Sequence, residues 1–251
     1  MIDCLRNLLR PVFCRPAATA LVALALSAGA EAQTVPASSM SSRVLACTAC
    51  HGKEGRATPD GYFPRIAGKP AGYLANQLLN FRDGRRSYPQ MGYLIEHLTD
   101  DYLREMAEHF AAQDIPYSPP PPPQAPPALL EQGRQLVQQG AAARRIPACV
   151  SCHGSAMTGV APSIPGLLGL PRDYLNSQLG AWKTGQRRAH VPDCMADIAR
   201  QLTPEDVSAV SAWLAAQPVA AGGKPARTLP AAMPARCGGV AEVPVAAAAA
   251  R

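Results

Sequence analysis

This 251-residue chain contains two cysteine pairs, and a histidine directly follows each pair. The residue types and their spacing indicate that these positions bind a cofactor or a metal. The run Cys47-Thr48-Ala49-Cys50-His51-Gly52 recurs as Cys149-Val150-Ser151-Cys152-His153-Gly154. Cys-x-x-Cys-His is the attachment pattern of c-type haem, because two thiols can add to the vinyl groups of one porphyrin above a proximal histidine. We therefore predict two covalently bound haem c groups. The predicted attachment residues are Cys47, Cys50, Cys149 and Cys152, and the predicted proximal iron ligands are His51 and His153.

Other chemistries of a cysteine pair fit the pattern less well. A redox dithiol is typical of a βαβ context and needs no trailing histidine. A zinc site needs four nitrogen or sulfur ligands in a closed shell. Pooling both pairs into one four-cysteine site would leave His51 and His153 without a role.

A distal iron ligand must come from farther along the chain, because the polypeptide has to reach the opposite face of the porphyrin. Methionine and histidine are the usual candidates, and methionine raises the reduction potential. Met91 and Met195 lie 40 and 42 residues after the two motif histidines and are 104 positions apart. We predict Met91 and Met195 as the distal ligands, with histidine as the alternative. Met106 fits a core position, and Met157 lies only four residues after His153 and cannot reach the far face. The other candidates have no counterpart in the other repeat: Met40, Met233, His97, His109 and His190.

Two prolines and two further cysteines complete the candidate residues. Pro64 and Pro165 follow the motif histidines by 13 and 12 residues, so their carbonyls could accept the second ring N–H of a metal-bound histidine. The alternative is that these prolines only shape a turn. Cys194 and Cys237 lie outside the motifs, and an oxidising compartment would let them form a disulfide. The alternative is a pair of unrelated thiols.

The elements that must position these residues form a repeated helical unit. Matching positions are offset by 101 to 104 residues, as in Tyr73-Leu74 and Tyr174-Leu175. Apolar residues recur at helical spacing within residues 73–81 and 103–110, and Thr203-Pro204 is typical of a helix start. Residues 129–139 predict a further helix before the second motif. Because alternating strand patterns are absent, we predict an all-α chain.

Composition divides the chain into five segments. Residues 1–32 combine three arginines, a 12-residue apolar stretch and Ala30-Glu31-Ala32, which predicts a cleaved export signal. Its removal leaves a net charge of +5, one less than the +6 of the whole chain. Eight of the twelve residues 116–127 are proline, which predicts a stiff linker between domains at 33–115 and 128–217. Residues 218–251 are rich in alanine and proline and predict a mobile tail.

The chain resembles a dihaem class I cytochrome c of the cytochrome c4 type. The paired motifs, Pro64-Arg65-Ile66-Ala67-Gly68 and the pattern Tyr-Leu-x-x-Gln-Leu-x-x-Phe/Trp-x-x-Gly carry this resemblance. It implies two tandem class I cytochrome c domains with His/Met-ligated haems, and electron transfer in the bacterial periplasm. It also implies that each proline carbonyl accepts from its proximal histidine. The proline-rich linker and the long tail depart from the family's usual pattern.

The function expected from these observations is that of an electron carrier and not of an enzyme. Each haem would replace core side chains, which fits an aromatic content of only 5%. Expected partners are a redox donor, either a quinol-oxidising complex or a dehydrogenase, and an acceptor such as a terminal oxidase. We expect no nucleic-acid partner, and peripheral membrane association stays open. The alternatives are a cytochrome subunit of a periplasmic dehydrogenase and a dihaem peroxidase. No apolar run is long enough for a polytopic membrane protein.

Overall fold

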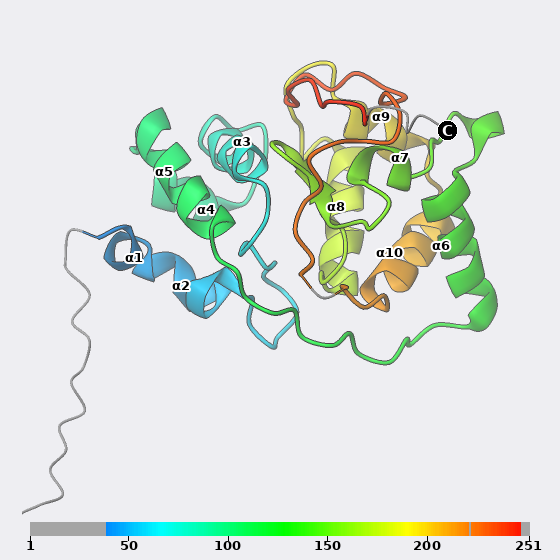
Figure 1. Cartoon of the computed structure of the whole chain (residues 1–251), viewed down its shortest axis with the longest axis horizontal. Helices are drawn as coiled ribbons and strands as arrows, with labels where there is room; N and C mark the ends of the chain where they lie inside the picture. Colours follow the sequence, from blue (N-terminus) through cyan, green and yellow to red (C-terminus); the bar gives the residue numbers. More distant parts are fainter. Residues whose placement is uncertain (1–38, 221, 247–251) are drawn as a thin grey trace, which may run out of the picture. The chain divides into compact units, whose positions relative to one another are not determined.

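Helices carry both copies of the cysteine–histidine motif in the computed structural model, which describes residues 39–220 and 222–246 (Figure 1). The predicted export signal at residues 1–32 lies outside the described residues. We call residues 40–113 the first repeat and residues 127–217 the second repeat. The first repeat contains α1 (Met40–Arg43), α2 (Leu45–His51), the 3₁₀ turn η1 (Lys53–Gly55), α3 (Ala71–Arg82), α4 (Pro89–Ile95) and α5 (Asp100–Ala111). The second contains α6 (Pro127–Gln139), η2 (Ala142–Arg144), α7 (Val150–His153), α8 (Arg172–Thr184), α9 (Cys194–Gln201) and α10 (Pro204–Ala215).

The first repeat is built on the packing of α3 against α5. The threonine before α5, Thr99, caps the helix by accepting a hydrogen bond from the Tyr102 N–H. The apolar stripe of α5 that the sequence predicts is buried in one cluster with residues of α3 and α4. Met106 belongs to this stripe and is only 7% exposed, as a core position requires.

The second repeat is built on α6 and α10, which lie alongside each other (Figure 1). The two helices approach so closely at Gly133 that a Cβ there would collide with the carbonyl oxygen of Ala209. Thr203 and Asp206 form a reciprocal capping box at the start of α10, with Pro204 in the first turn. The prediction of a helical fold is therefore confirmed for the described part of the chain.

The all-α prediction misses one short hairpin in the second repeat. The strands β1 (Gly159–Val160) and β2 (Ile164–Pro165) pair antiparallel, with Val160 opposite Ile164. Two residues are too few for an alternating hydrophobic pattern, so the sequence carries no strand signal here. The hairpin fixes Pro165, whose carbonyl belongs to the candidate site described below.

Part of the tail contacts the hairpin in the structure. The Ala226 N–H donates to the Gly159 carbonyl at 2.9 Å, and the Ala226 carbonyl accepts from the Ala161 N–H at 2.8 Å. Leu229 and Val243 are buried against the two hairpin residues Val160 and Ile164. A few scattered apolar residues of the tail therefore form a small core with the hairpin, which composition alone does not reveal.

The proline-rich segment has neither helix nor strand from residue 113 to residue 126, and α6 begins at Pro127, the last residue of the predicted linker. Its first carbonyls are held by the guanidinium of Arg65, which donates to Ile115 and Pro116 and stacks over the Tyr117 ring at 4.0 Å.

Within the described residues, no helix is long and apolar enough to cross a bilayer.

Candidate functional site

Each cysteine–histidine motif lies on a short helix that ends at the glycine following the histidine. In the first repeat, α2 carries Cys47, Cys50 and His51 and ends at Gly52, whose φ is +74°. A Cβ at Gly52 would lie 2.4 Å from the carbonyl oxygen of Ala57, so only glycine allows this close turn. The turn lets the chain leave the helix directly after the histidine. The second motif ends in the same way, with a φ of +81° after His153.

Both motif histidines are oriented by a proline carbonyl. The Nδ1–H of His51 donates to Pro64 at 2.9 Å, and that of His153 donates to Pro165 at 2.7 Å. Burial lowers the pKa of both histidines, and the carbonyl contacts oppose that shift in each case. A neutral imidazole that is protonated at Nδ1 keeps its Nε2 lone pair free for a metal.

A cavity of about 1170 Å³ brings the predicted site residues of both repeats together. Its wall includes the four motif cysteines, both motif histidines, Pro64, Pro165, Met91 and Met195. Much of the remaining lining is aliphatic or aromatic, for example Leu74, Ile95, Leu175 and Val210. An apolar cavity with free thiols and histidine ligands fits a large flat macrocycle that is attached to the chain. Among the described residues, no three His, Cys, Asp or Glu side chains cluster as a separate metal site.

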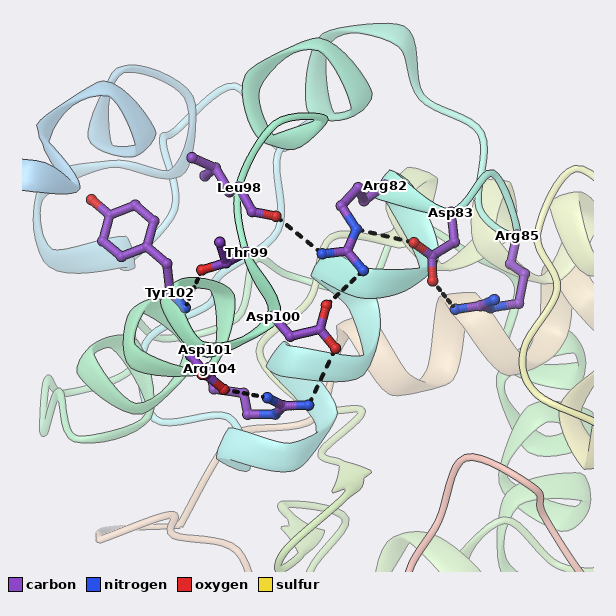
Figure 2. Close-up of polar contacts among 9 residues, drawn as sticks. All are labelled: Arg82, Asp83, Arg85, Leu98, Thr99, Asp100, Asp101, Tyr102 and Arg104. Atoms are coloured by element: carbon purple, nitrogen blue, oxygen red, sulfur yellow. Dashed lines mark hydrogen bonds and ion pairs between the residues drawn. The ribbon is translucent and has the colours of Figure 1, made fainter.

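In the first repeat the predicted distal ligand, Met91, lies on α4, in the segment that joins α3 to α5. An arginine at the end of α3 braces this segment (Figure 2). Arg82 donates to the Leu98 carbonyl at 3.0 Å and pairs with Asp83 at 3.0 Å and Asp100 at 2.7 Å. The brace ties the end of α3 to the start of α5, and so it fixes both ends of the segment that carries Met91.

The second repeat uses the same design with a different cation. Lys183, offset by 101 from Arg82, donates to the carbonyls of Ala199 and Leu202. Leu202 is the repeat equivalent of Leu98. In both repeats, the cation therefore donates to the leucine carbonyl shortly before the last helix, α5 or α10. Met195 lies on α9 within this braced segment.

Two arginines at equivalent positions join the repeats. Arg86 donates to Tyr174 at 3.1 Å and Gln178 at 2.6 Å, both on α8. Arg187 donates to Tyr73 at 3.3 Å and Gln77 at 3.0 Å, both on α3. Their backbones also form an antiparallel bridge. The contact between the repeats therefore has an approximate two-fold symmetry.

Buried cations on the cavity wall fit a cofactor that carries carboxylates. Lys69 and Arg187 are 4% and 5% exposed, and both line the cavity. Their hydrogen-bond partners are neutral carbonyl, amide and phenol oxygens. A buried charge is costly unless it is paired with an opposite one. Haem bears two carboxylates, so the donor set of this cavity suits it.

Cys194 and Cys237 form a disulfide in the structure, with Cα atoms 5.1 Å apart. Cys194 is the residue before Met195, so the bond fastens the tail directly beside a predicted iron ligand. The neighbouring Gly238 N–H donates to Pro192 at 2.8 Å and strengthens this attachment.

The structure also places the residues that the sequence reasoning set aside. Met157 is buried in the core cluster of the second repeat, and His97 is 90% exposed. Met106 and Met233 line the cavity in addition to the two predicted distal ligands. The arginine pair and the two braces were not predicted. The arginine pair could have been noticed in the sequence, because Arg86 and Arg187 are separated by the repeat offset of 101.

Comparison with known proteins finds similar cytochromes and related electron acceptors. The family model described as Cytochrome c matches residues 130–217. A thiosulfate dehydrogenase electron acceptor of Stutzerimonas stutzeri (strain A1501) is 37% identical over 171 residues, covering 68% of this chain and 78% of the relative. Cytochrome c4 of Pseudomonas aeruginosa is 32% identical over 174 residues, covering 68% of this chain and 84% of the relative. The solved thiosulfate dehydrogenase (TsdBA) of Marichromatium purpuratum superposes with a TM-score of 0.62 at 32% identity, covering 70% of this chain and 37% of that one.

The chain belongs to the dihaem class I cytochromes c of the cytochrome c4 type. It is a c-type electron carrier that holds covalently bound haem c at its two Cys-x-x-Cys motifs.

Proposed function

We propose that this chain accepts electrons from a periplasmic dehydrogenase that oxidises thiosulfate, and passes them singly to a terminal acceptor such as an oxidase. The observation that carries the proposal is the 37% identity to a thiosulfate dehydrogenase electron acceptor. The structural similarity to a thiosulfate dehydrogenase, over 70% of this chain, supports the same donor.

Each haem iron would be held by one histidine and one methionine. His51 and His153 would each supply a nitrogen ligand, and Met91 and Met195 would each supply a sulfur ligand. Haem c supplies an iron that exchanges one electron between its ferric and ferrous forms. With these histidine and methionine ligands in place, neither iron would have a position for substrate, so the chain would transfer electrons without making or breaking bonds.

The proline carbonyls and the cavity wall have separate roles in this proposal. Pro64 and Pro165 fix the ring orientation and the tautomer of the proximal histidines. The apolar wall excludes water, which limits the reorganisation that accompanies each electron transfer. A dehydrogenase removes electrons in pairs, and two one-electron sites on one chain can take up such a pair.

We also propose the chain organisation that the sequence predicts. Residues 33–115 and 128–217 act as two cytochrome c domains, residues 116–127 connect them, and residues 1–32 direct export to the periplasm. Two separate hydrophobic clusters, one around Leu103 and one around Leu214, support a core for each domain. The mass of the purified protein tests the removal of residues 1–32 and the haem content, since it should equal residues 33–251 plus two haems.

A second candidate function is a general shuttle between a quinol-oxidising complex and an oxidase. The 32% identity to a cytochrome c4 favours it. The two functions differ in the electron donor and not in the site.

The test is reduction of the purified oxidised protein by a thiosulfate dehydrogenase and thiosulfate, followed in the visible spectrum. We expect two electrons taken up per chain, at a rate that saturates with the concentration of this protein. A matched reaction uses a quinol-oxidising complex with quinol. Fast reduction by the complex and none by the dehydrogenase would replace the proposed donor with the second candidate.

A further inference from the structure

Lys69 of the first repeat reaches the proximal side of the second site. Its Nζ donates to the Gly166 carbonyl at 2.9 Å. Gly166 directly follows Pro165, whose own carbonyl accepts the hydrogen bond from His153 at 2.7 Å. Two successive carbonyls of one chain segment therefore hold the ammonium group and the proximal histidine. The side chain of Lys69 also lines the cavity that contains both candidate sites.

The charge on Lys69 acts on the second site in an environment that water screens weakly. Lys69 is 4% exposed, and its hydrogen-bond partner is a neutral carbonyl. Burial, and to a smaller extent the charge of Arg65, lowers the pKa of Lys69 to about 7. The ammonium group binds the carbonyl of Gly166, the residue next to Pro165, whose carbonyl accepts from His153.

Among the described residues, no side-chain cation donates to the Arg65 carbonyl, the equivalent of the Gly166 carbonyl in the first repeat. The repeat offset of 101 places Leu170 where the first repeat has Lys69, and Arg65 where the second repeat has Gly166. Leu170 is buried in the core cluster of its own repeat. Arg65 points its guanidinium at the Ala67, Ile115 and Pro116 carbonyls of the first repeat and its linker. The link through Lys69 therefore runs in one direction only, from the first repeat to the second site.

We propose that Lys69 is a positioning and tuning residue that raises the reduction potential of the second site more than that of the first. One-electron reduction lowers the net charge of a site by one unit, so a nearby buried cation stabilises the reduced form. The inference rests on the proposed electron-carrier function and adds to it a residue that contributes to the second potential without binding the iron.

The test compares Lys69→Gln, which removes the charge, with Lys69→Met, which also removes the hydrogen bond. Both reduction potentials are measured by spectroelectrochemical titration at about pH 6, below the pKa of Lys69 of about 7. The Met195→Ala variant identifies which of the two transitions belongs to the second site. Lys53→Gln is the matched control, because Lys53 is an exposed lysine of the same repeat.

We expect both Lys69 variants to lower the potential of the second transition by about 59 mV, a tenfold change in the ratio of oxidised to reduced iron. The first transition should move less, and the control should move neither. Equal shifts of both transitions, or none, would overturn the proposal. If Lys69→Gln does not fold, Lys69→Arg keeps the charge and must keep the wild-type separation of the two potentials. These potentials are measured without any partner protein, so their outcome is independent of whether thiosulfate dehydrogenase is the donor.

Discussion

Arg86 and Arg187 occupy equivalent positions in the two repeats, and each donates hydrogen bonds to the same pair of glutamines. Arg86 contacts Gln77 at 3.0 Å and Gln178 at 2.6 Å, and Arg187 contacts Gln178 at 2.8 Å and Gln77 at 3.0 Å. Each glutamine oxygen thus accepts from one arginine of its own repeat and one of the other. The four side chains form one shared network at the junction of the repeats.

Loss of this network should destabilise the protein in a non-additive way. Arg86→Ala and Arg187→Ala should each lower the free energy of unfolding by about 2 kcal/mol, because each removes hydrogen bonds from a charged donor. Since the two arginines share acceptors, the double variant should differ from the sum by about 1 kcal/mol. Denaturant unfolding measures all three values. Arg104→Ala, which breaks only exposed ion pairs, is the control and should change stability little. Strict additivity would show that the network is not shared.

Replacement of a distal methionine should open one iron. Reduced Met91→Ala and Met195→Ala should each bind one carbon monoxide per chain, and the double variant should bind two. Each variant should also lower the potential of its own site, because a methionine ligand favours the reduced form. Met157→Leu is the control, since Met157 is buried in the core. Unchanged spectra in the alanine variants would shift the assignment to Met106 or Met233, which also line the cavity.

The two braces should stabilise their own methionine segments and not each other's. Arg82→Ala removes the bonds to Leu98 and Asp100, so Met91 should leave its iron at a lower denaturant concentration than in the wild type (Figure 2). Lys183→Ala should do the same to Met195 alone. The methionine–iron absorption band, followed during unfolding, reports the change. A variant that affects both sites equally would contradict separate braces.

The disulfide between Cys194 and Cys237 should hold the tail against the second repeat. Cys237→Ser should expose residues 222–246 to limited proteolysis and cost about 4 kcal/mol in the chain-entropy model of a loop of 43 residues. Cys194→Ser should give the same result, because one bond is lost in either case. A thiol count on the denatured, unreduced protein provides a direct check. Finding reactive Cys194 and Cys237 thiols would rule the bond out.

Asp206 should make stability depend on pH in the acidic range. Burial alone would raise the pKa of Asp206, but hydrogen bonds from Arg144, the Thr203 N–H and Gln132 outweigh burial and lower it. Because the folded pKa lies below the unfolded one, this carboxylate contributes stability above the unfolded pKa of about 3.9. The contribution is lost as the pH falls through the folded pKa.

The corresponding variant is Asp206→Asn. It should cost about 2 kcal/mol near neutral pH and progressively less in more acidic solution, as measured by denaturant unfolding at several pH values. Asp197→Asn, which removes an exposed carboxylate, is the control and should show little difference at any pH. A cost that stays constant down to strongly acidic pH would contradict the role of the charge.

The candidate haem-binding residues could be predicted from the sequence, because they are recognised by their spacing along the chain. The motif cysteines, His51 and His153 are fixed by a short helix, and the repeat offset selected Met91 and Met195 among the methionines. Helices were predicted where the apolar period was long, as in α5. The hairpin at Val160 was missed because two residues carry no period.

The sequence by itself determined the cofactor chemistry, the repetition and the helical class, because these follow from residue types at short separations. Only the tertiary structure decided which distant residues meet. The contact of Lys69 with Gly166 spans 97 positions, and that of Arg187 with Tyr73 spans 114. The tail's attachment beside Met195 has the same origin. Such contacts depend on how packed helices bring separated segments together, and no local pattern in the chain encodes that arrangement.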